Sequence, residues 1–396
     1  MGLFSFSKKK PKRDVALCLD IGSANIGASL IALYPGTIIQ PEVISSSRKD
    51  IPFTDELNFD DFLIAMTKTL HLVLLDIHKK AKGVPEKAFV VLASPWYASE
   101  TKKIHYSKDT PFTFTKEIWD ALLKDEVKHF EDEHMSKYKH IGDHARLLEK
   151  KNIKVYLNGY DTENPVGKKT KTLDLSLYLS MSPLSILSLI HTKIQSVFAI
   201  DKIRFSSFLY ASFVVFRDMI SESKDFICID VGGEVTDIAI IKDDAIVDSV
   251  SFPLGKNALI RSLSKSLKVS PPDVLSLFAL YSSGRCEDKI KNKIESALAK
   301  IQSEWLSHFQ KGLMTMKGEL EVPNAVFITA DKDVGEWFRM AVENDEFGQY
   351  ALSERKFNAI LIDGSILNRY VTWNGELESD PFIMLETIFI SRNKIL

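Results

Sequence analysis

A short motif that occurs once near the N-terminus and again beyond the middle of the chain constrains the fold more than any other feature. The first copy covers residues 17–23 (LCLDIGS) and the second covers residues 227–233 (ICIDVGG). Each copy is an apolar run that ends in Asp, an aliphatic residue and Gly, and a second β-like run follows it, at 26–33 and at 236–241. The pattern predicts two matching strand–turn–strand units, as expected of a duplicated domain.

The turns of these two units consist of small residues, which suits them to bind phosphate. Backbone N–H groups in such a turn approach a phosphate closely, because no large side chain stands in the way. An Asp at each strand end, here Asp20 and Asp230, can hold a metal ion or its water shell. One copy alone is equally consistent with an ordinary β-turn. Two matching copies favour a cleft in which both turns clamp the phosphates of a nucleotide.

Size and composition place the chain among ordinary soluble proteins of more than one domain. It has 396 residues, of which 45% are hydrophobic and 26% are charged. The net charge of −2 gives no general attraction to nucleic acid or to anionic membranes. The three cysteines form no CxxC pair and no Cys/His cluster, which argues against a structural zinc site and favours a reducing, cytoplasmic setting. No apolar run reaches the ~18–20 residues that a membrane span needs.

Residues 1–13 form a basic leader, in which the charged residues follow a few apolar ones. A secretory signal has the opposite order, with its charges first. Two interpretations stay open. The leader is either a disordered, solubilising segment or a segment that touches anionic lipid, since each basic residue adds about 1 kcal/mol near such a surface.

The rest of the chain divides into further predicted elements. Apolar residues at helical spacing predict helices at 62–77, 185–198 and 205–216. Residues 95–182 differ in character and predict a small α+β insert. Within it we expect a helix from Thr115, strands at 153–160 and 172–181, and a turn at 164–167 (NPVG). Beyond the second unit we expect strands at 249–254 and 325–329, and helices at 258–267, at 290–309 and from Val334.

In order and in motif, these features resemble the actin-like superfamily (actin, Hsp70 and the sugar kinases), and within it the bacterial FtsA/PilM group. Residues 20–23 resemble the first phosphate loop of the family, and residues 230–239 resemble the second. Residues 158–167 resemble the hairpin of the extra subdomain that distinguishes FtsA-like proteins from actin. Residues 253–257 (PLGKN) resemble the turn after the second loop. The resemblance covers residues 15–385.

The resemblance implies an α/β fold of two duplicated, ribonuclease H-like domains around a nucleotide cleft. The first domain would comprise 14–94 and 183–216, and the second 217–396, whose last strand or helix can return to the first; the FtsA-type insert would be 95–182. The resemblance also implies ATP with Mg²⁺ as cofactor, and no other metal. The residues carried over as Mg²⁺ or phosphate contacts are Asp20, Asp230 and Asp237, and those carried over as nucleotide contacts are Gly22, Ser23, Ala24, Asn25, Gly232, Gly233, Thr236 and Gly255.

Several positions depart from the family pattern. Asp331 and Lys332 stand where the family has a glycine cluster against the purine. The best alignment puts Leu275 and Phe278 where the family has polar residues against the ribose. Glu234 replaces a common third glycine of the second loop, where its charge repels a triphosphate unless it is turned away or bound to Mg²⁺. These departures predict that ATP binding is weak or lost.

The function that the resemblance implies is a cytoplasmic scaffold at the inner face of the cell membrane. Through its insert it would link a pilus-assembly or cell-division machine, and its partner would be a cytoplasmic segment of a membrane protein or a second copy of the chain, not nucleic acid. Trp96, Trp119, Asn164 and Pro165 are the candidate partner contacts, although core packing accounts for the tryptophans equally well. The alternative is an active ATPase or small-molecule kinase, for which no substrate-pocket signature is present.

Overall fold

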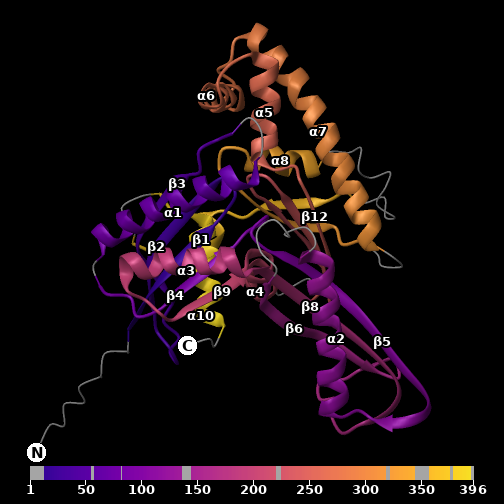
Figure 1. Ribbon diagram of the computed structural model, residues 1–396. Helices are drawn as coiled ribbons and strands as arrows, with labels where there is room; N and C mark the ends of the chain where they lie inside the picture. Colours follow the sequence, from indigo (N-terminus) through magenta and orange to yellow (C-terminus); the bar gives the residue numbers. More distant parts are fainter. Residues whose placement is uncertain are drawn as a thin grey trace, which may run out of the picture.

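The computed structural model describes residues 13–54, 58–81, 83–135, 144–219, 224–317, 322–343, 356–374 and 378–393. Most of the basic leader lies outside the described residues, so both interpretations of it stay predictions. The described chain forms two α/β domains and an insert that projects from them (Figure 1).

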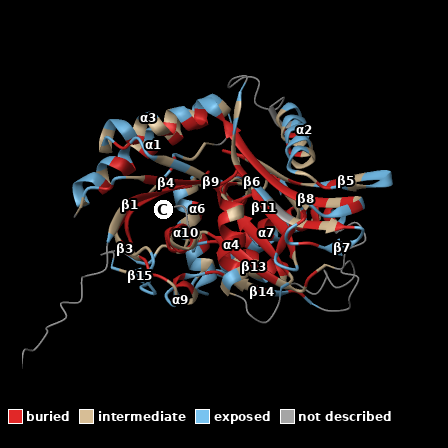
Figure 2. Ribbon diagram, turned by 90° about the horizontal axis from the view of Figure 1, so that it is seen from below, coloured by how far each residue is buried: buried red, intermediate tan, exposed pale blue. Residues whose placement is uncertain are grey.

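The first domain is built on the sheet that contains the first copy of the motif. In spatial order its strands are β15 (Thr372–Trp373), β3 (Glu42–Asp50), β2 (Asn25–Leu33), β1 (Asp14–Ile21), β4 (Ala88–Leu92) and β9 (Ile203–Ser207). Its helices are α1 (Phe59–Lys80), α3 (Leu184–Phe198), α4 (Phe208–Met219), α9 (Gly364–Leu367) and α10 (Pro381–Arg392). Helices α1 and α3 cover one face of the sheet, and α4 and α10 cover the other (Figure 2). Strands β2 and β4 are buried along their whole length, because both faces are covered.

The second domain repeats this arrangement around the second copy of the motif. In spatial order its strands are β12 (Ala245–Phe252), β11 (Thr236–Lys242), β10 (Phe226–Val231), β13 (Ala325–Ala330) and β14 (Asn358–Leu361). Strand β10 pairs antiparallel with β11 and parallel with β13, as β1 does with β2 and β4. Its helices are α5 (Lys256–Leu267), α6 (Pro271–Ser282), α7 (Asp288–Lys317) and α8 (Gly335–Val342). The prediction of two duplicated α/β domains is confirmed.

The insert is a small sheet with one long helix beside it (Figure 1). Its elements are β5 (Ala98–Thr113), α2 (Lys116–Met135), β6 (Ala145–Leu157), β7 (Tyr160–Asp161) and β8 (Lys169–Pro183). The central strand β8 pairs antiparallel with both β5 and β6. Phe114, Phe130, Leu173 and Leu177 are fully buried between the sheet and the helix, so the insert has a core of its own.

Two predicted elements differ from the structure. The predicted helix at 205–216 begins only at Phe208, because residues 203–207 form β9 and pair with β4 along the edge of the first sheet. The predicted strand at 153–160 begins earlier, at Ala145, in a stretch whose polar residues hide it. In both places long-range strand pairing outweighs the local pattern.

The last described helix belongs to the first domain, although the second domain precedes it in the sequence. Residues Thr372 and Trp373 pair with β3, and α10 then packs across β1, β2 and α4. Residues 383–390 of α10 are all buried. The chain therefore passes from the second domain back to the first before its last described residue.

We expect Ile388→Ala on α10 to destabilise the protein by about 2–5 kcal/mol, because the side chain is 1% exposed and its loss leaves a cavity in the first core. Urea denaturation measures this change in the free energy of unfolding. The matched control is Ile64→Ala on α1, where the side chain is 52% exposed and the expected change is below about 0.5 kcal/mol. Equal effects of the two substitutions would contradict the packing of α10.

Candidate functional site

The two copies of the motif form the same tight turn after their first strand. In the first copy, the Gly22 N–H donates to the Asn25 carbonyl at 3.1 Å. In the second, the Gly232 N–H donates to the Val235 carbonyl at 3.0 Å. The turns follow equivalent strands of the two sheets, β1 and β10, and they meet between the two domains.

The two turns are in direct contact with each other. The Glu234 N–H donates to the Ser23 hydroxyl at 3.0 Å. A Cβ atom on Gly233 would lie 2.4 Å from the Ala24 nitrogen and 2.6 Å from the Ser23 carbonyl carbon, so only glycine permits this approach. The backbone of one turn therefore occupies the place next to the other turn where a phosphate would have to lie.

The space that remains between the turns is very small. It measures about 20 Å³, which is room for about one water molecule, whereas pockets for small ligands measure roughly 300–1,000 Å³. Thr236, Asp237 and Gly255 do not line it. The predicted site residues that line it are Asp20, Gly22, Ser23, Ala24, Asn25, Asp230, Gly232 and Gly233. In this arrangement the predicted ATP site does not fit a triphosphate.

The carboxylates of the second unit are buried and bonded to hydroxyl groups of the protein itself. Thr329 donates to Asp230 at 2.7 Å, and Ser94 donates to Asp237 at 3.0 Å. Burial, followed by the charge of Asp237, raises the pKa of Asp230 well above its usual range. Burial also raises the pKa of Asp237. Both carboxyl groups are thus buried and held in hydrogen bonds within the protein.

An ion-pair network occupies the cleft beside the turns; it consists of Arg48, Asp20, Asp380, Asn25, Asp331, Lys256 and Asp333. Arg48 on β3 lies at its centre. Its guanidinium donates to Asp20 at 2.7 Å and to Asp380 at 2.6 and 3.0 Å, and it also donates to the Asn25 side-chain oxygen. Gly27 makes room for it, since a Cβ atom there would lie 2.7 Å from the guanidinium. Burial raises the pKa of Asp20 to about 6, although Arg48 opposes that shift.

The network continues into the second domain. The Asn25 amide donates to both oxygens of Asp331 at 3.1 Å. The Lys256 ammonium lies 2.9 Å from Asp331 and 2.7 Å from Asp333. Burial opposes ionisation of Asp331, but Lys256 together with Arg48 and Asn25 outweighs this effect and holds the pKa of Asp331 below its usual value. Since Asn25 belongs to the first domain and Asp331 to the second, these bonds join the two domains.

Some residues expected near the nucleotide serve the second domain's core instead. The Thr236 hydroxyl donates to the Leu254 carbonyl at 2.6 Å and accepts from the Trp305 indole at 3.1 Å, so it faces away from the turns. Phe278 is buried in the second core, and Leu275 packs against the same core. In this arrangement these side chains serve the core, and their assignment to phosphate or ribose contact stays a prediction.

Two charged residues expected at the cleft are turned away from it. Glu234 is buried and forms a two-point ion pair with Arg261 on α5, so its charge does not face the space between the turns. Lys332 is exposed and pairs with Glu378 at 2.8 Å. Of the two side chains expected to replace the purine-facing glycines, Asp331 alone enters the cleft.

Trp96 is part of the first core and not a surface contact. It is fully buried, stacks on Phe62 with ring centroids 4.8 Å apart, and donates its indole N–H to the Gly22 carbonyl at 2.7 Å. The prediction that Trp96 binds a partner is therefore wrong. Its indole instead holds the first turn in place through the hydrogen bond to Gly22.

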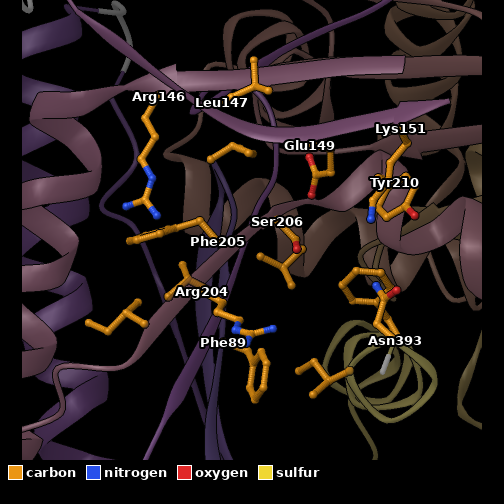
Figure 3. A pocket seen from close by; sticks show the side chains of 16 residues that line it. Phe89, Arg146, Leu147, Glu149, Lys151, Arg204, Phe205, Ser206, Tyr210 and Asn393 are labelled. Atoms are coloured by element: carbon orange, nitrogen blue, oxygen red, sulfur yellow. The ribbon is translucent and has the colours of Figure 1, made fainter. Parts of the chain in front are cut away.

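A groove of about 330 Å³ lies between the insert and the first domain. Its walls come from β6 of the insert and from β4, β9, α4 and α10 of the first domain. Figure 3 shows the side chains that surround it, including Arg146, Arg204, Phe205, Tyr210 and Asn393. Sequence reasoning did not identify this groove, because it forms only where β6 and β9 come together.

Glu149 is the buried acidic group of this groove. Its carboxylate accepts the Ser207 N–H at 3.0 Å, the Ser207 hydroxyl at 2.9 Å and the Ser180 hydroxyl. Burial raises its pKa to about 6, against the effect of these hydrogen bonds. Because Ser207 lies at the junction of β9 and α4, Glu149 joins the insert to the first domain.

The other predicted partner contacts lie on the insert, away from this groove. Trp119 and Pro165 line a hollow of about 580 Å³ together with Lys116 and Lys154. Asn164 is exposed beside it. Their assignment as partner contacts stays a prediction.

No protein-family model matches the sequence, and no curated protein sequence matches it. Several solved structures, in contrast, are similar to the structure of this chain. A PilM–PilN type IV pilus biogenesis complex is 12% identical, with 95% of this chain and 96% of that chain covered and a TM-score of 0.61. This chain has an actin-like fold. The prediction of that fold, with PilM among the proteins it resembles, is confirmed.

Two further structures are more distant. The ethanolamine utilization protein EutJ from Carboxydothermus hydrogenoformans is 13% identical, with 96% of this chain and 90% of that chain covered and a TM-score of 0.44. A Bacteroides thetaiotaomicron protein with an actin-like ATPase fold and unknown function is 10% identical, with 98% and 99% covered and a TM-score of 0.42.

The part of the chain that the structure describes lacks two further features. No described helix is both long enough and apolar enough to cross a membrane. Within the same residues, no three His, Cys, Asp or Glu side chains are grouped so that they could hold a metal ion.

We expect Glu149→Gln to change the pH dependence of stability. The folded-state pKa of about 6 lies above the ordinary value of 4.5. The wild-type carboxyl therefore contributes stability that is complete below the lower pKa and is lost as the pH rises through the higher one. The loss is about 2 kcal/mol. The variant, which resembles the protonated form, should gain stability relative to wild type between those pKa values.

Urea denaturation over this pH range measures the difference. The control is Glu304→Gln at an exposed position on α7. Its free energy of unfolding should differ from that of the wild type by the same amount at every pH in this range. If Glu149→Gln also gave a constant difference, its carboxyl would not have the raised pKa.

Proposed function

We propose that this protein is a cytoplasmic adaptor that binds an extended segment of a membrane protein in the groove between its insert and its first domain. The likeness to a complex of PilM with PilN supports a role of the kind found in type IV pilus assembly. The observation that carries the proposal is the pair of strand edges that border the groove.

These edges supply backbone groups that a further strand can use. Among the described residues, β9 is the last strand on its side of the first sheet. In β6, residues 145–155 pair with β8 on one side, and the described pairing with β7 begins only at Tyr156. Backbone N–H and C=O groups on such edges accept an extended segment through main-chain hydrogen bonds. Glu149 takes up one of them, the Ser207 N–H, so the segment would lie beside this point and not across it.

The side chains of the groove indicate the chemistry of the segment. Arg146, Lys151 and Arg204 line the groove and are exposed, and none is paired with an acidic side chain of the described residues. Phe205 adds apolar surface. A segment that combines acidic with apolar residues would complement this surface.

An active ATPase or small-molecule kinase has less support. Both would need room for a nucleotide and an ionised carboxylate near its phosphates. The turns are in contact, and Asp230 and Asp237 accept hydrogen bonds from the protein's own hydroxyls.

A photo-crosslinking amino acid placed at Phe205 tests the proposal in cells. We expect an adduct with a single membrane protein, mapped by mass spectrometry to a part of it outside the membrane. Arg204→Glu should lower the yield of this adduct by roughly tenfold, which corresponds to about 1.4 kcal/mol of binding free energy. The matched control carries the crosslinker at exposed Ile64 on α1, which should give no such adduct.

The rival explanation is a simple electrostatic tether through the leader. The same cells should therefore express a variant without residues 2–13. If this deletion alone released the protein from the membrane fraction and Phe205 gave no adduct, the adaptor proposal would fail. An adduct that persists without the leader would support the groove.

A further inference from the structure

We propose that the network in the cleft, which Asn25 and Asp331 link across the two domains, holds these domains closed without a nucleotide. This inference rests on the cleft alone and does not depend on the proposed adaptor function. It makes closure a property of the chain itself and not a response to ATP.

The first argument is that the two turns are already bonded to each other and to the start of α5. The Glu234 N–H of the second turn donates to Ser23 of the first turn. Just below, the Lys256 and Asn257 N–H groups donate to the carbonyls of Gly232 and Gly233 at 2.9 and 2.8 Å. A phosphate entering between the turns would have to break the bond from Glu234 to Ser23 and separate the turns.

The second argument is the charge balance of the cleft. Arg48 contacts Asp20 and Asp380 within the first domain, and Lys256 contacts Asp331 and Asp333 within the second. The Asn25 amide joins the two groups at Asp331. The side chains of Arg48 and Lys256 are only 22% and 11% exposed. Buried charges are tolerated when each has a partner, and removal of one partner leaves the other uncompensated. A triphosphate would compete with these carboxylates for the same two cations.

The third argument is that further contacts between the two domains, beside the network, also hold the cleft closed. The Ser94 hydroxyl of the first domain donates to Asp237 of the second at 3.0 Å. Arg261 on α5 reaches the Thr54 carbonyl at 3.5 Å and lies over the Phe53 ring, 5.7 Å from its centroid. The closed arrangement is thus supported on several sides of the turns.

Two measurements on the full chain test the wild-type protein. Calorimetry with Mg-ATP should show no saturable binding, with any dissociation constant weaker than ~1 mM. Spin labels at Leu72→Cys on α1 and Leu280→Cys on α6, both exposed, report the distance between the domains in a Cys286→Ser background. We expect one narrow distance distribution that Mg-ATP does not change.

Variants then test the network itself. Lys256→Met removes a cation that is 11% exposed and leaves Asp331, which carries the bonds to Asn25, without its ion-pair partner; it should broaden the distance distribution toward longer values. Lys332→Met is the matched control, because its ion pair with Glu378 also joins the two domains but is more than four-fifths exposed. Asp331→Asn is a second variant in case Lys256→Met does not fold, since it removes one charge and keeps a side chain of the same shape.

Broadening in Lys256→Met or Asp331→Asn, but not in Lys332→Met, together with no ATP binding, supports the proposal. Micromolar binding of Mg-ATP by the wild type, or an ATP-dependent shift of the distance, would overturn it. So would a distribution in both buried variants as narrow as that of the control. None of these readouts involves the groove, so the two proposals can fail separately.

Discussion

The arrangement of the first domain depends on the ion pairs that Arg48 makes with Asp20 and Asp380. A guanidinium is a planar fork of donors, and it can satisfy two carboxylates at once. Asp20 lies at the end of β1, and Asp380 is the N-cap residue of α10. One side chain thereby fixes the first turn of the chain relative to its last described helix. Through Asn25 the same side chain is connected to the second domain.

Much of the fold follows from local patterns that the sequence shows openly. The two apolar runs before Asp20 and Asp230 are short, lie next to small-residue turns and match each other, so their strands and their duplication were predictable. The insert was recognisable by its change in character and by the turn at 164–167. Long amphipathic helices such as α1 and α7 were predictable from their period. Strand β9 was not, because its identity as a strand comes from pairing with β4.

The chemistry of the cleft was less predictable because it depends on partners far apart in the sequence. Arg48 and Asp380 carry no motif, and only the closed fold shows that they meet. Lys256 lies in the predicted turn at 253–257, but nothing in the sequence marks it as the partner of Asp331. Glu149 lies in a polar stretch that gives no sign of burial. Trp96 shows the opposite difficulty, since an aromatic residue suits a core and an interface equally well until its neighbours are known.

Helix α10 extends from the cleft to the groove. Its N-cap, Asp380, is held by Arg48, while Phe389 and Ile390 in its last turn form part of the groove wall. A helix of 12 residues is about 18 Å long, and this one is tightly packed along its buried residues. The helix therefore spans the distance between the two sites, and each of its ends contributes residues to one of them. The cleft and the groove thus share one buried element of the first domain.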